Sequence, residues 1–144
     1  MFLGTYEHSI DDKGRMTIPA RFRELILGGA YLTQGIDHNL VVMLAENFDR
    51  VMLELDQMSG TDPTIRLLKR KLFANAQRVE IDRLGRILIA ESHRAYAQLN
   101  DKAIVVGSGS NFEIWSPELW LKQDEMLSNE NFAAELRKYN LPLL

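Results

Sequence analysis

A short sequence occurs twice in this chain, and the repetition constrains the fold more than any other feature. Residues 10–24 align without a gap on residues 81–95, at an offset of 71, and six of the fifteen aligned positions are identical. A duplicated unit predicts a molecule with pseudo-two-fold symmetry. The identical positions are Ile10/Ile81, Asp11/Asp82, Gly14/Gly85, Arg15/Arg86, Ile18/Ile89 and Arg23/Arg94. Weaker matches continue at an offset of 72, in Gly35/Gly107, Asn39/Asn111 and Phe48/Trp120.

The length of 144 residues allows a buried core, but each copy of roughly 45 residues is too small to fold alone. We therefore expect one cooperative α+β unit in which the two copies share a compact core. The expected parts are a first unit at 5–47, connecting helices at 48–76, a second unit at 77–120 and a C-terminal helical segment at 121–144.

The composition excludes several classes of protein. The chain has no cysteine, which removes disulfides, thiolate nucleophiles and cysteine metal sites and fits a reducing cytoplasm. No stretch approaches the ~18 apolar residues of a membrane span, so we expect a soluble, cytoplasmic protein. The net charge is −3, yet residues 66–94 hold eight basic side chains and three acidic ones. Such clustering, if on one face, attracts a phosphate backbone; a solvated helix face over 66–71 is the alternative.

Local patterns predict the same order of elements in both copies. In the first, strands at 6–10 and 15–18 form a hairpin around the turn 11–14, and a helix begins at Pro19 and ends at Gly28. Strands at 31–33 and 40–44 then form a second hairpin around the turn 35–39. In the second, the corresponding elements lie at 78–81, 86–90, 91–99, 103–106 and 112–115. Helices are expected at 46–58, 63–76, from Ser116 as cap and Pro117 as first residue, and at 130–139; the tail 140–144 is not assigned.

The repeated turn carries the residues best suited to binding. Its pattern is Asp-x-x-Gly-Arg, with Asp11, Gly14 and Arg15 in one copy and Asp82, Gly85 and Arg86 in the other. Glycine permits a tight turn and a close backbone approach, and arginine offers a fork that suits phosphate or the guanine edge. Further phosphate contacts could come from Lys13, Arg21, Arg23 and Arg83. The alternative is that each aspartate simply pairs with its own arginine at the surface.

Catalytic chemistry has little support in the sequence. His8, His38 and His93 follow no metal-ligand spacing, and His8 and His93 are expected to be structural or exposed. Residues 107–110 lack the lysine of a phosphate-binding loop and indicate a turn, while Trp115 and Trp120 suit packing or a subunit contact. We therefore expect no enzyme, no cofactor, no metal and no small-molecule substrate.

The N-terminal segment MFLGTYEHSIDDKGRMTIPARFR (1–23) and the segment FEIWSPELW (112–120) resemble the MraZ family of bacterial transcriptional regulators, which act at the head of the division and cell-wall gene cluster. The resemblance covers residues 1–127. It implies two swapped-hairpin units of the AbrB type that form one barrel-like core, ring-shaped homo-oligomers, and repression through double-stranded DNA with direct repeats upstream of the protein's own gene and the adjacent genes. It also implies that Arg15 and Arg86 face DNA while Asp11 and Asp82 shape the turns.

Two positions depart from the repeat. Ala90 replaces Pro19, and Leu84 replaces Lys13, so the second turn is expected to contact DNA differently or less. The hypothesis is a non-enzymatic, nucleoid-associated DNA-binding repressor. One rival is an antitoxin-like interaction module of the same fold, acting through the acidic region 113–144. The other is an enzyme acting on nucleic acid or methyl groups, for which the sequence offers no nucleophile, metal site or cofactor loop.

Overall fold

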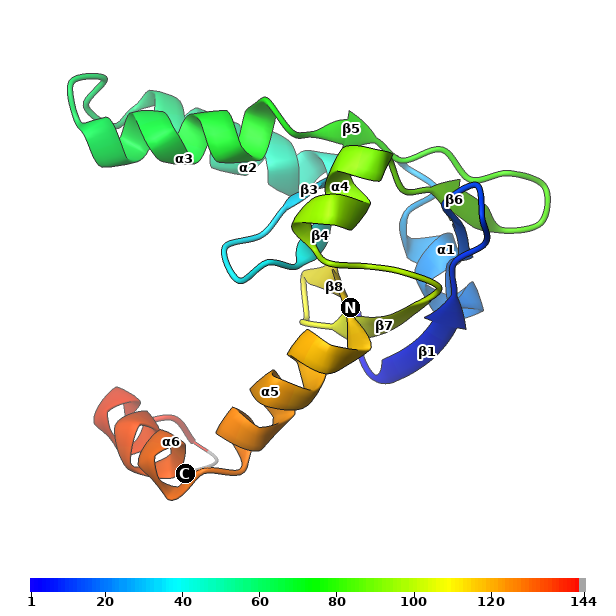
Figure 1. The fold of residues 1–144 in the computed structure, drawn as a ribbon. Helices are drawn as coiled ribbons and strands as arrows, with labels where there is room; N and C mark the ends of the chain where they lie inside the picture. The colour runs from blue at the N-terminus through cyan, green and yellow to red at the C-terminus, as the bar shows by residue number, and fades with distance from the viewer. Residues whose placement is uncertain (143–144) are drawn as a thin grey trace.

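The computed structural model describes residues 1–142, which form an antiparallel sheet of six strands with helices around it (Figure 1). The mixed α+β class expected from the sequence is confirmed. The strands follow the spatial order β1 (Thr5–Ser9), β7 (Lys102–Gly107), β8 (Asn111–Trp115), β4 (Leu40–Leu44), β3 (Ala30–Gln34) and β5 (Gln77–Arg78).

The strand order is symmetric, because equivalent strands of the two copies follow one another in the same order from either edge of the sheet. Strands β1, β3 and β4 of the first copy correspond to β5, β7 and β8 of the second. Strand β1 pairs with β7, and β5 pairs with β3, so the first strand of each copy lies in the half-sheet of the other. The barrel-like closure expected from the sequence is not confirmed, because β1 and β5 form the two edges of the sheet.

A separate two-stranded ribbon is formed by β2 (Arg15–Thr17) and β6 (Arg86–Leu88), one strand from each copy. The hairpins predicted around the turns 11–14 and 82–85 are therefore wrong beyond those turns, whereas the second hairpin of each copy, β3 with β4 and β7 with β8, is confirmed. In the first copy the hairpin is closed next to its turn by the bridge between Ile10 and Met16 and by a hydrogen bond of 3.0 Å from the Asp11 N–H to the Arg15 carbonyl. Beyond these contacts β1 pairs with β7, and β2 pairs with β6. Side chains of a strand alternate between its faces. Met16 and its partner Ile87 are buried, so the ribbon covers the core with this central pair.

The core lies between the ribbon and the sheet and is centred on three phenylalanines. The ring of Phe22 lies 5.1 Å from that of Phe2 and 5.0 Å from that of Phe112. Phe2 reaches this position because its backbone N–H donates to the Gly109 carbonyl at 2.7 Å. At Gly107 a Cβ would lie 2.5 Å from the Phe2 backbone, so only glycine lets the N-terminal segment cross here.

Two short helices connect strands on either side of the ribbon. Helix α1 (Ala20–Leu25) begins one residue later than predicted, because Pro19 is its N-cap and not its first residue. Helix α4 (Glu91–Tyr96) ends before the predicted residue 99, and Gln98 just beyond it adopts a left-handed conformation with φ of 57°. These ends set the start of β3 and β7.

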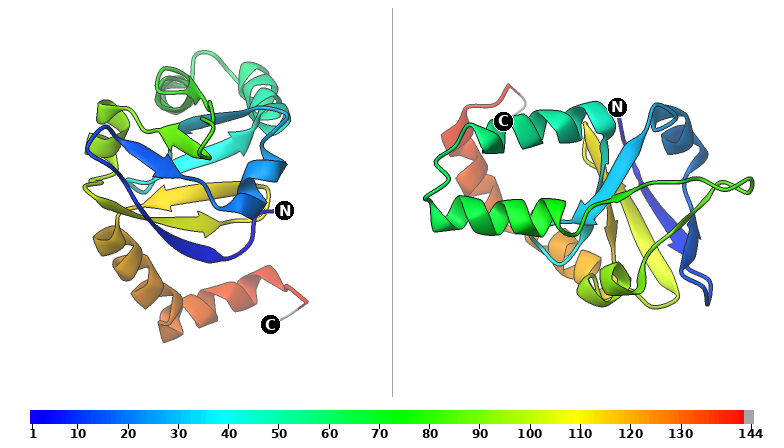
Figure 2. Two further views of the ribbon diagram at one scale, coloured as in Figure 1. Left: turned by 90° about the vertical axis from the view of Figure 1, so that its right-hand side faces the viewer. Right: turned by 90° about the horizontal axis from the view of Figure 1, so that it is seen from above.

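Helices α2 (Ala45–Asp56) and α3 (Pro63–Phe73) form a helical hairpin that projects from one end of the molecule (Figures 1 and 2). Both end two or three residues earlier than predicted. The hairpin is fastened by an ion pair of 2.8 Å between Lys69 and Asp56, and by a hydrogen bond of 2.6 Å from the Thr33 hydroxyl to the Leu72 carbonyl. The Phe48 ring stacks on Tyr31, which joins α2 to the sheet.

The C-terminal segment consists of α5 (Pro117–Leu127), α6 (Glu130–Leu136) and a 3-10 turn at Arg137–Tyr139. The predicted cap is confirmed, because the Ser116 side chain accepts a hydrogen bond from the Leu119 N–H at 3.1 Å. Neither helix contains a buried residue, and α5 leads away from the sheet (Figure 1). The end of the unassigned tail, residues 143–144, lies outside the described part of the chain. Within residues 1–142 no helix combines the length and apolar character needed to cross a membrane.

Candidate functional site

The two Asp-x-x-Gly-Arg turns have the same internal hydrogen bonds. In the first turn, Asp11 Oδ1 accepts from the backbone N–H groups of Lys13 and Arg15 at 3.0 and 2.8 Å. In the second, Asp82 Oδ1 accepts from those of Leu84 and Arg86 at 2.9 and 3.0 Å. Asparagine and aspartate side chains commonly stabilise turns in this way. Each aspartate therefore holds the shape of its turn.

Each aspartate also orients the arginine that follows its turn. Asp11 Oδ2 accepts from Arg15 Nε at 2.7 Å, and Asp82 Oδ2 accepts from Arg86 Nε at 2.8 Å. The alternative of an aspartate–arginine pair is thus realised in both turns. These bonds use Nε alone. Within residues 1–142 no hydrogen bond engages the terminal nitrogens of either arginine, so the outer edge of each fork is open to a ligand.

The hydrogen bonds change the ionisation of both aspartates in the same direction. The backbone hydrogen bond from Arg15 is the main reason why the pKa of Asp11 is lowered from its ordinary value. The hydrogen bond from Arg86 has the same effect on the pKa of Asp82. Both carboxylates are therefore charged at neutral pH and keep their arginines paired.

The ribbon places the two arginines on one outward face. Met16 and Ile87 point into the core, so the residues before and after them point outward. Arg15 lies opposite Leu88, and Arg86 lies opposite Thr17. The two arginines are thus diagonal neighbours on the ribbon, a relation that corresponds to Cα atoms on the order of 7–8 Å apart. They are equivalent under the pseudo-two-fold relation of the repeat.

Each turn is fixed by residues of the other copy. The Ile18 N–H donates to the Gly85 carbonyl at 2.9 Å, and the Ile89 N–H donates to the Gly14 carbonyl at 2.8 Å. Arg23 lies against Gly85, where a Cβ would overlap its guanidinium. Arg23, one of the expected phosphate contacts, therefore lies beside the second turn and is half-buried, and its contact with phosphate stays a prediction.

Arg94 is the equivalent residue that the sequence reasoning did not include in the site. Its Nε donates to the Ile89 carbonyl at 3.0 Å and would lie 2.9 Å from a Cβ at Gly14. The signal was present in the sequence, because Arg23 and Arg94 are identical across the repeat, as are the glycines that they cover. The conformations explain the glycines: φ is 84° at Gly14 and 77° at Gly85, a region that side-chain-bearing residues rarely adopt.

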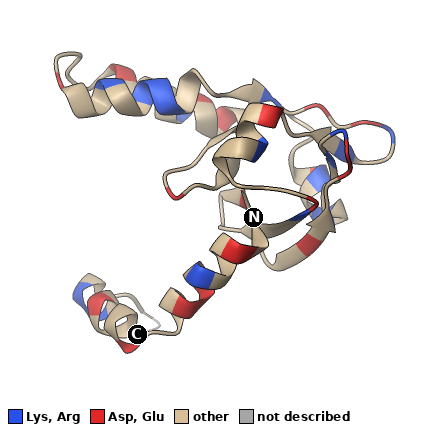
Figure 3. Cartoon of the chain, in the orientation of Figure 1, with Lys and Arg blue, Asp and Glu red and all other residues tan. Residues whose placement is uncertain are grey.

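The other predicted basic residues, Lys13, Arg83 and Arg21, are exposed. Lys13 and Arg83 belong to the tips of the two turns, and Arg21 lies on α1. Figure 3 shows basic and acidic residues side by side at these tips. Lys13 and Arg15 thus lie at one end of the ribbon, and Arg83 and Arg86 lie at the other end.

The basic stretch 66–94 is divided between two ends of the molecule. The part on α3 lies in the projecting helical hairpin, whereas the turns lie at the opposite end (Figures 1 and 2). On α3, Lys69 pairs with Asp56, and Lys71 Nζ lies 4.2 Å from the centre of the Tyr96 ring. These side chains support local packing and do not extend the arginine face.

The remaining candidates for chemistry have structural surroundings. His93 is 4% exposed, and its Nε2 donates to the Asn75 carbonyl at 2.6 Å. Trp115 is 3% exposed, and its ring lies 5.7 Å from that of Trp120, in agreement with the packing role predicted for the pair. Among the residues that the structure describes, no group of three or more histidines and carboxylates could hold a metal ion.

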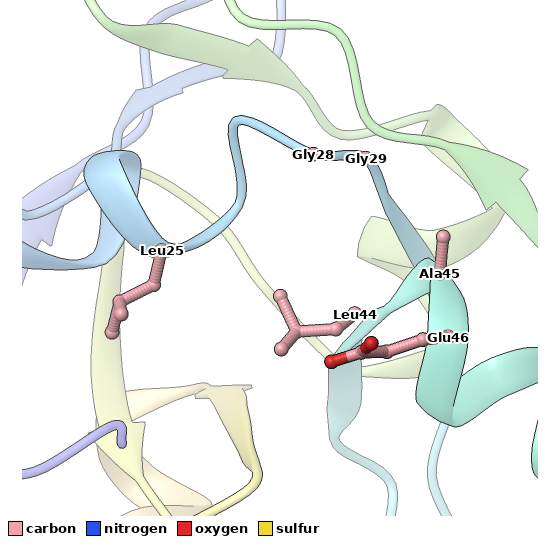
Figure 4. A pocket seen from close by; sticks show the side chains of 6 residues that line it. All are labelled: Leu25, Gly28, Gly29, Leu44, Ala45 and Glu46. Carbon is pink, nitrogen blue, oxygen red and sulfur yellow. The ribbon is translucent and has the colours of Figure 1, made fainter.

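A shallow cavity of about 200 Å³ lies between the loop that follows α1 and the junction of β4 with α2 (Figure 4). Its walls include the side chains of Leu25 and Leu44, and Glu46 contributes the carboxylate. No residue of the two arginine turns lines it, so it is separate from the face described above.

The fold and the site define a class of protein in which two interlocked copies of one unit present a pair of arginine turns on a shared ribbon. Residues 1–71 and 72–140 each match a family model described as "MraZ protein, putative antitoxin-like". Proteins named transcriptional regulator MraZ from Thermomicrobium roseum, Corynebacterium glutamicum and Mycolicibacterium smegmatis are 48%, 41% and 38% identical to the chain. The alignments cover 90%, 94% and 93% of this chain and 92%, 94% and 93% of the relatives.

The chain therefore belongs to the MraZ family, which confirms the resemblance seen in its sequence. These relatives are named as regulators and not as enzymes, in agreement with the expectation that the chain is not an enzyme.

Proposed function

We propose that this protein is a sequence-specific DNA-binding transcriptional regulator that represses its target genes. The observation that carries the proposal is the pair of arginines on the outer face of one ribbon, each oriented by an aspartate and open at its terminal nitrogens. The names of the relatives support the same function.

In this proposal the residues of the two turns have distinct roles. Arg15 and Arg86 reach the base edges of the major groove, where a forked guanidinium pairs with guanine. Lys13, Arg83 and Arg21 contact phosphates and position the protein without reading sequence. Asp11, Gly14, Asp82 and Gly85 shape the turns, while Arg23, against Gly85, supports the second one.

We propose that the chain works as a homo-oligomeric ring on direct repeats upstream of its own gene and the adjacent division and cell-wall genes, in the cytoplasm and on the nucleoid. Head-to-tail subunits in a ring point the same way, as direct repeats do, and several weak contacts then add through effective concentration. The helical hairpin α2–α3 and the segment α5–α6 support self-association because both expose apolar side chains away from the arginine face: Leu53, Met58, Leu67, Leu121, Met126 and Leu127. The units 5–47 and 77–120 each supply one turn, and 48–76 and 121–144 supply the subunit contacts.

The proposal is tested by titrating the purified protein into fluorescent duplex DNA from upstream of its own gene, with a scrambled duplex of the same composition as control. Binding of the native duplex that is at least tenfold tighter than that of the scrambled one, and that is lost in Arg15→Ala, is the expected result. Equal binding to both duplexes would overturn sequence-specific regulation. The size of the assembly is measured in parallel by light scattering.

The rival function, an antitoxin-like module that sequesters another protein, is favoured by one observation. Residues 113–144 combine six acidic side chains with the apolar residues of α5 and α6, none of which is buried. If a partner protein co-purifies with the chain and is lost on deletion of residues 128–144, while no duplex is bound specifically, this rival replaces the regulator.

A further inference from the structure

The two turns present different side chains on the same backbone frame. Both turns have aspartate, glycine and arginine at equivalent positions. The aspartates accept the same hydrogen bonds, and the two glycines have similar positive φ values. Between the aspartate and the glycine, the first turn has Asp12-Lys13 and the second has Arg83-Leu84. Because the frame is the same, Lys13 and Leu84 occupy equivalent places relative to the ribbon and its arginines.

Leu84 donates its backbone N–H to Asp82 in the second turn, whereas its side chain lies outside the core of the described residues. That side chain is 68% exposed, although the neighbouring glycine is buried against Arg23. A single exposed leucine needs no explanation by itself. Here it lies two residues before Arg86, whose terminal nitrogens are open, so a ligand held by that arginine is close to the turn that carries the leucine.

The chemistry of the major groove limits what a leucine can recognise there. Base edges present hydrogen-bond donors and acceptors, which leucine cannot pair, and one apolar group, the 5-methyl group of thymine. Covering one methyl group corresponds to about a fourfold change in affinity. Lys13 at the equivalent place has a charge that suits a phosphate instead.

We propose that Leu84 is a specificity residue that contacts a thymine methyl group, so that the two turns of one subunit read different bases. This inference rests on the proposed DNA binding and goes beyond it, because it makes the site of one subunit asymmetric despite the pseudo-two-fold frame. The second turn then recognises bases partly through an apolar contact, and does not simply bind DNA more weakly than the first turn.

The test removes single methyl groups from DNA. A duplex is selected from a random-sequence pool with the full-length protein, and each thymine in it is replaced in turn by deoxyuridine, which lacks only the 5-methyl group. We expect one or two replacements to weaken binding about fourfold. In Leu84→Ala the unmodified duplex should bind about fourfold more weakly than to the wild type, and the same deoxyuridine replacements should have no effect.

A matched control is Leu27→Ala, which removes another leucine that is 79% exposed and lies outside both turns. It should keep the full response to deoxyuridine. The inference is overturned if no replacement weakens binding to the wild type, or if the response persists in Leu84→Ala. If Arg15→Ala abolishes specific binding in either case, the proposed function stands without this inference. If the wild type selects no duplex, both fail.

The substitution Lys13→Leu tests the same idea in the other direction. It places leucine in the first turn on an otherwise unchanged frame, because Lys13 is exposed and, within residues 1–142, contributes its backbone N–H and not its side chain to the hydrogen bonds of the turn. Selection with this variant should give duplexes with thymine enriched at one additional position. Unchanged base preference would show that the tip position does not read bases and would overturn the inference.

Discussion

The first and second turns share their interior and differ at their tips. Both are fixed by an aspartate, a glycine with positive φ and a cross-copy hydrogen bond from an isoleucine N–H. At the tip, Asp12-Lys13 stands against Arg83-Leu84, and on the following helix Arg21 stands where the second copy has Ser92. The duplicated frame thus tolerates different surfaces, because the constraints on the turns come from backbone contacts and not from the tip side chains.

The largest expected effect separates the contributions of the two turns to DNA binding. Arg15→Ala and Arg86→Ala each remove one fork, and a bidentate arginine–guanine pair corresponds to about 1–3 kcal/mol, or roughly 5- to 150-fold in Kd. Fluorescence anisotropy with the selected duplex measures both losses. Arg15→Lys keeps the charge but not the fork and should recover only a minor part of the affinity.

A loss confined to Arg15→Ala would show that the first turn alone reads DNA. If both alanine variants bound like the wild type, the ribbon face would not be the binding site. The shared features of the two turns would then serve the fold and not DNA binding.

The next effect concerns stability and separates the two glycines. A non-glycine residue in the left-handed region costs about 1–2 kcal/mol, so both Gly14→Ala and Gly85→Ala should lower the free energy of unfolding. A Cβ at Gly14 would also lie 2.8 Å from the Ile89 carbonyl, which is backbone and cannot move alone, whereas at Gly85 it would meet the end of the Arg23 side chain. Gly14→Ala should therefore be the more destabilising, by about 1 kcal/mol or more in urea unfolding.

The double variant Gly85→Ala with Arg23→Ala is the control for this interpretation, since it removes the side chain that the new Cβ would meet. It should be no less stable than the sum of the two single variants predicts. Equal losses for Gly14→Ala and Gly85→Ala would indicate that φ alone sets the cost.

A smaller effect concerns phosphate contacts, which differ between the copies at residue 21. Removing one phosphate contact lowers the slope of log Kobs against log salt by about 0.9 in magnitude. Arg21→Ala should produce this change, and Ser92→Arg should raise the slope by a similar amount. Titrations at several salt concentrations measure both variants, and an unchanged slope in Arg21→Ala would exclude that residue from the interface.

The smallest expected effect is on how the free energy of unfolding depends on pH in acid, and the two turns should contribute equally to it. The lowered pKa values of Asp11 and Asp82 mean that the folded state favours their charged forms. Their stabilising contribution is thus complete above the ordinary carboxyl pKa of about 4 and is lost as the pH falls through the lowered values. Asp11→Asn and Asp82→Asn should each make unfolding less sensitive to pH below about 4, and neither should alter its pH dependence between 6 and 8. Unequal effects would contradict the equivalence of the two frames.

The positions of the helices, strands and turns were predicted better than the pairing of the strands. Turn residues and helix caps act locally, so the positions of Gly14, Ser116 and the two repeat turns were correct. An alternating pattern indicates a strand but does not say what it pairs with, and β1 and β2 were therefore joined into a hairpin instead of being assigned to β7 and β6. The second copy was harder still, because β5 consists of Gln77 and Arg78 and overlaps the predicted strand 78–81 only at Arg78.

The repeat predicted which residues lie together at the two turns, but not how they contact one another. Arg15 and Arg86 are hydrogen-bonded to the aspartates of their own turns, and the DNA-binding role of these residues stays a prediction. A basic residue near a turn is expected to face a ligand, yet Arg23 and Arg94 lie against the glycines of the opposite turn, because the missing Cβ leaves room for a guanidinium there. Such a contact joins residues about 60–80 positions apart and cannot be inferred from local pattern.

The exchange of strands between the copies also shapes how the protein is made. Thr5 pairs with Val106, so β1 leaves the ribosome long before its partner exists. At about 5–20 residues per second, the N-terminal strand waits roughly 5–20 s for β7 during translation. Its sequence suits this delay, because Thr5, Glu7 and Ser9 alternate with Tyr6 and His8 and give the nascent strand little apolar surface on which to aggregate.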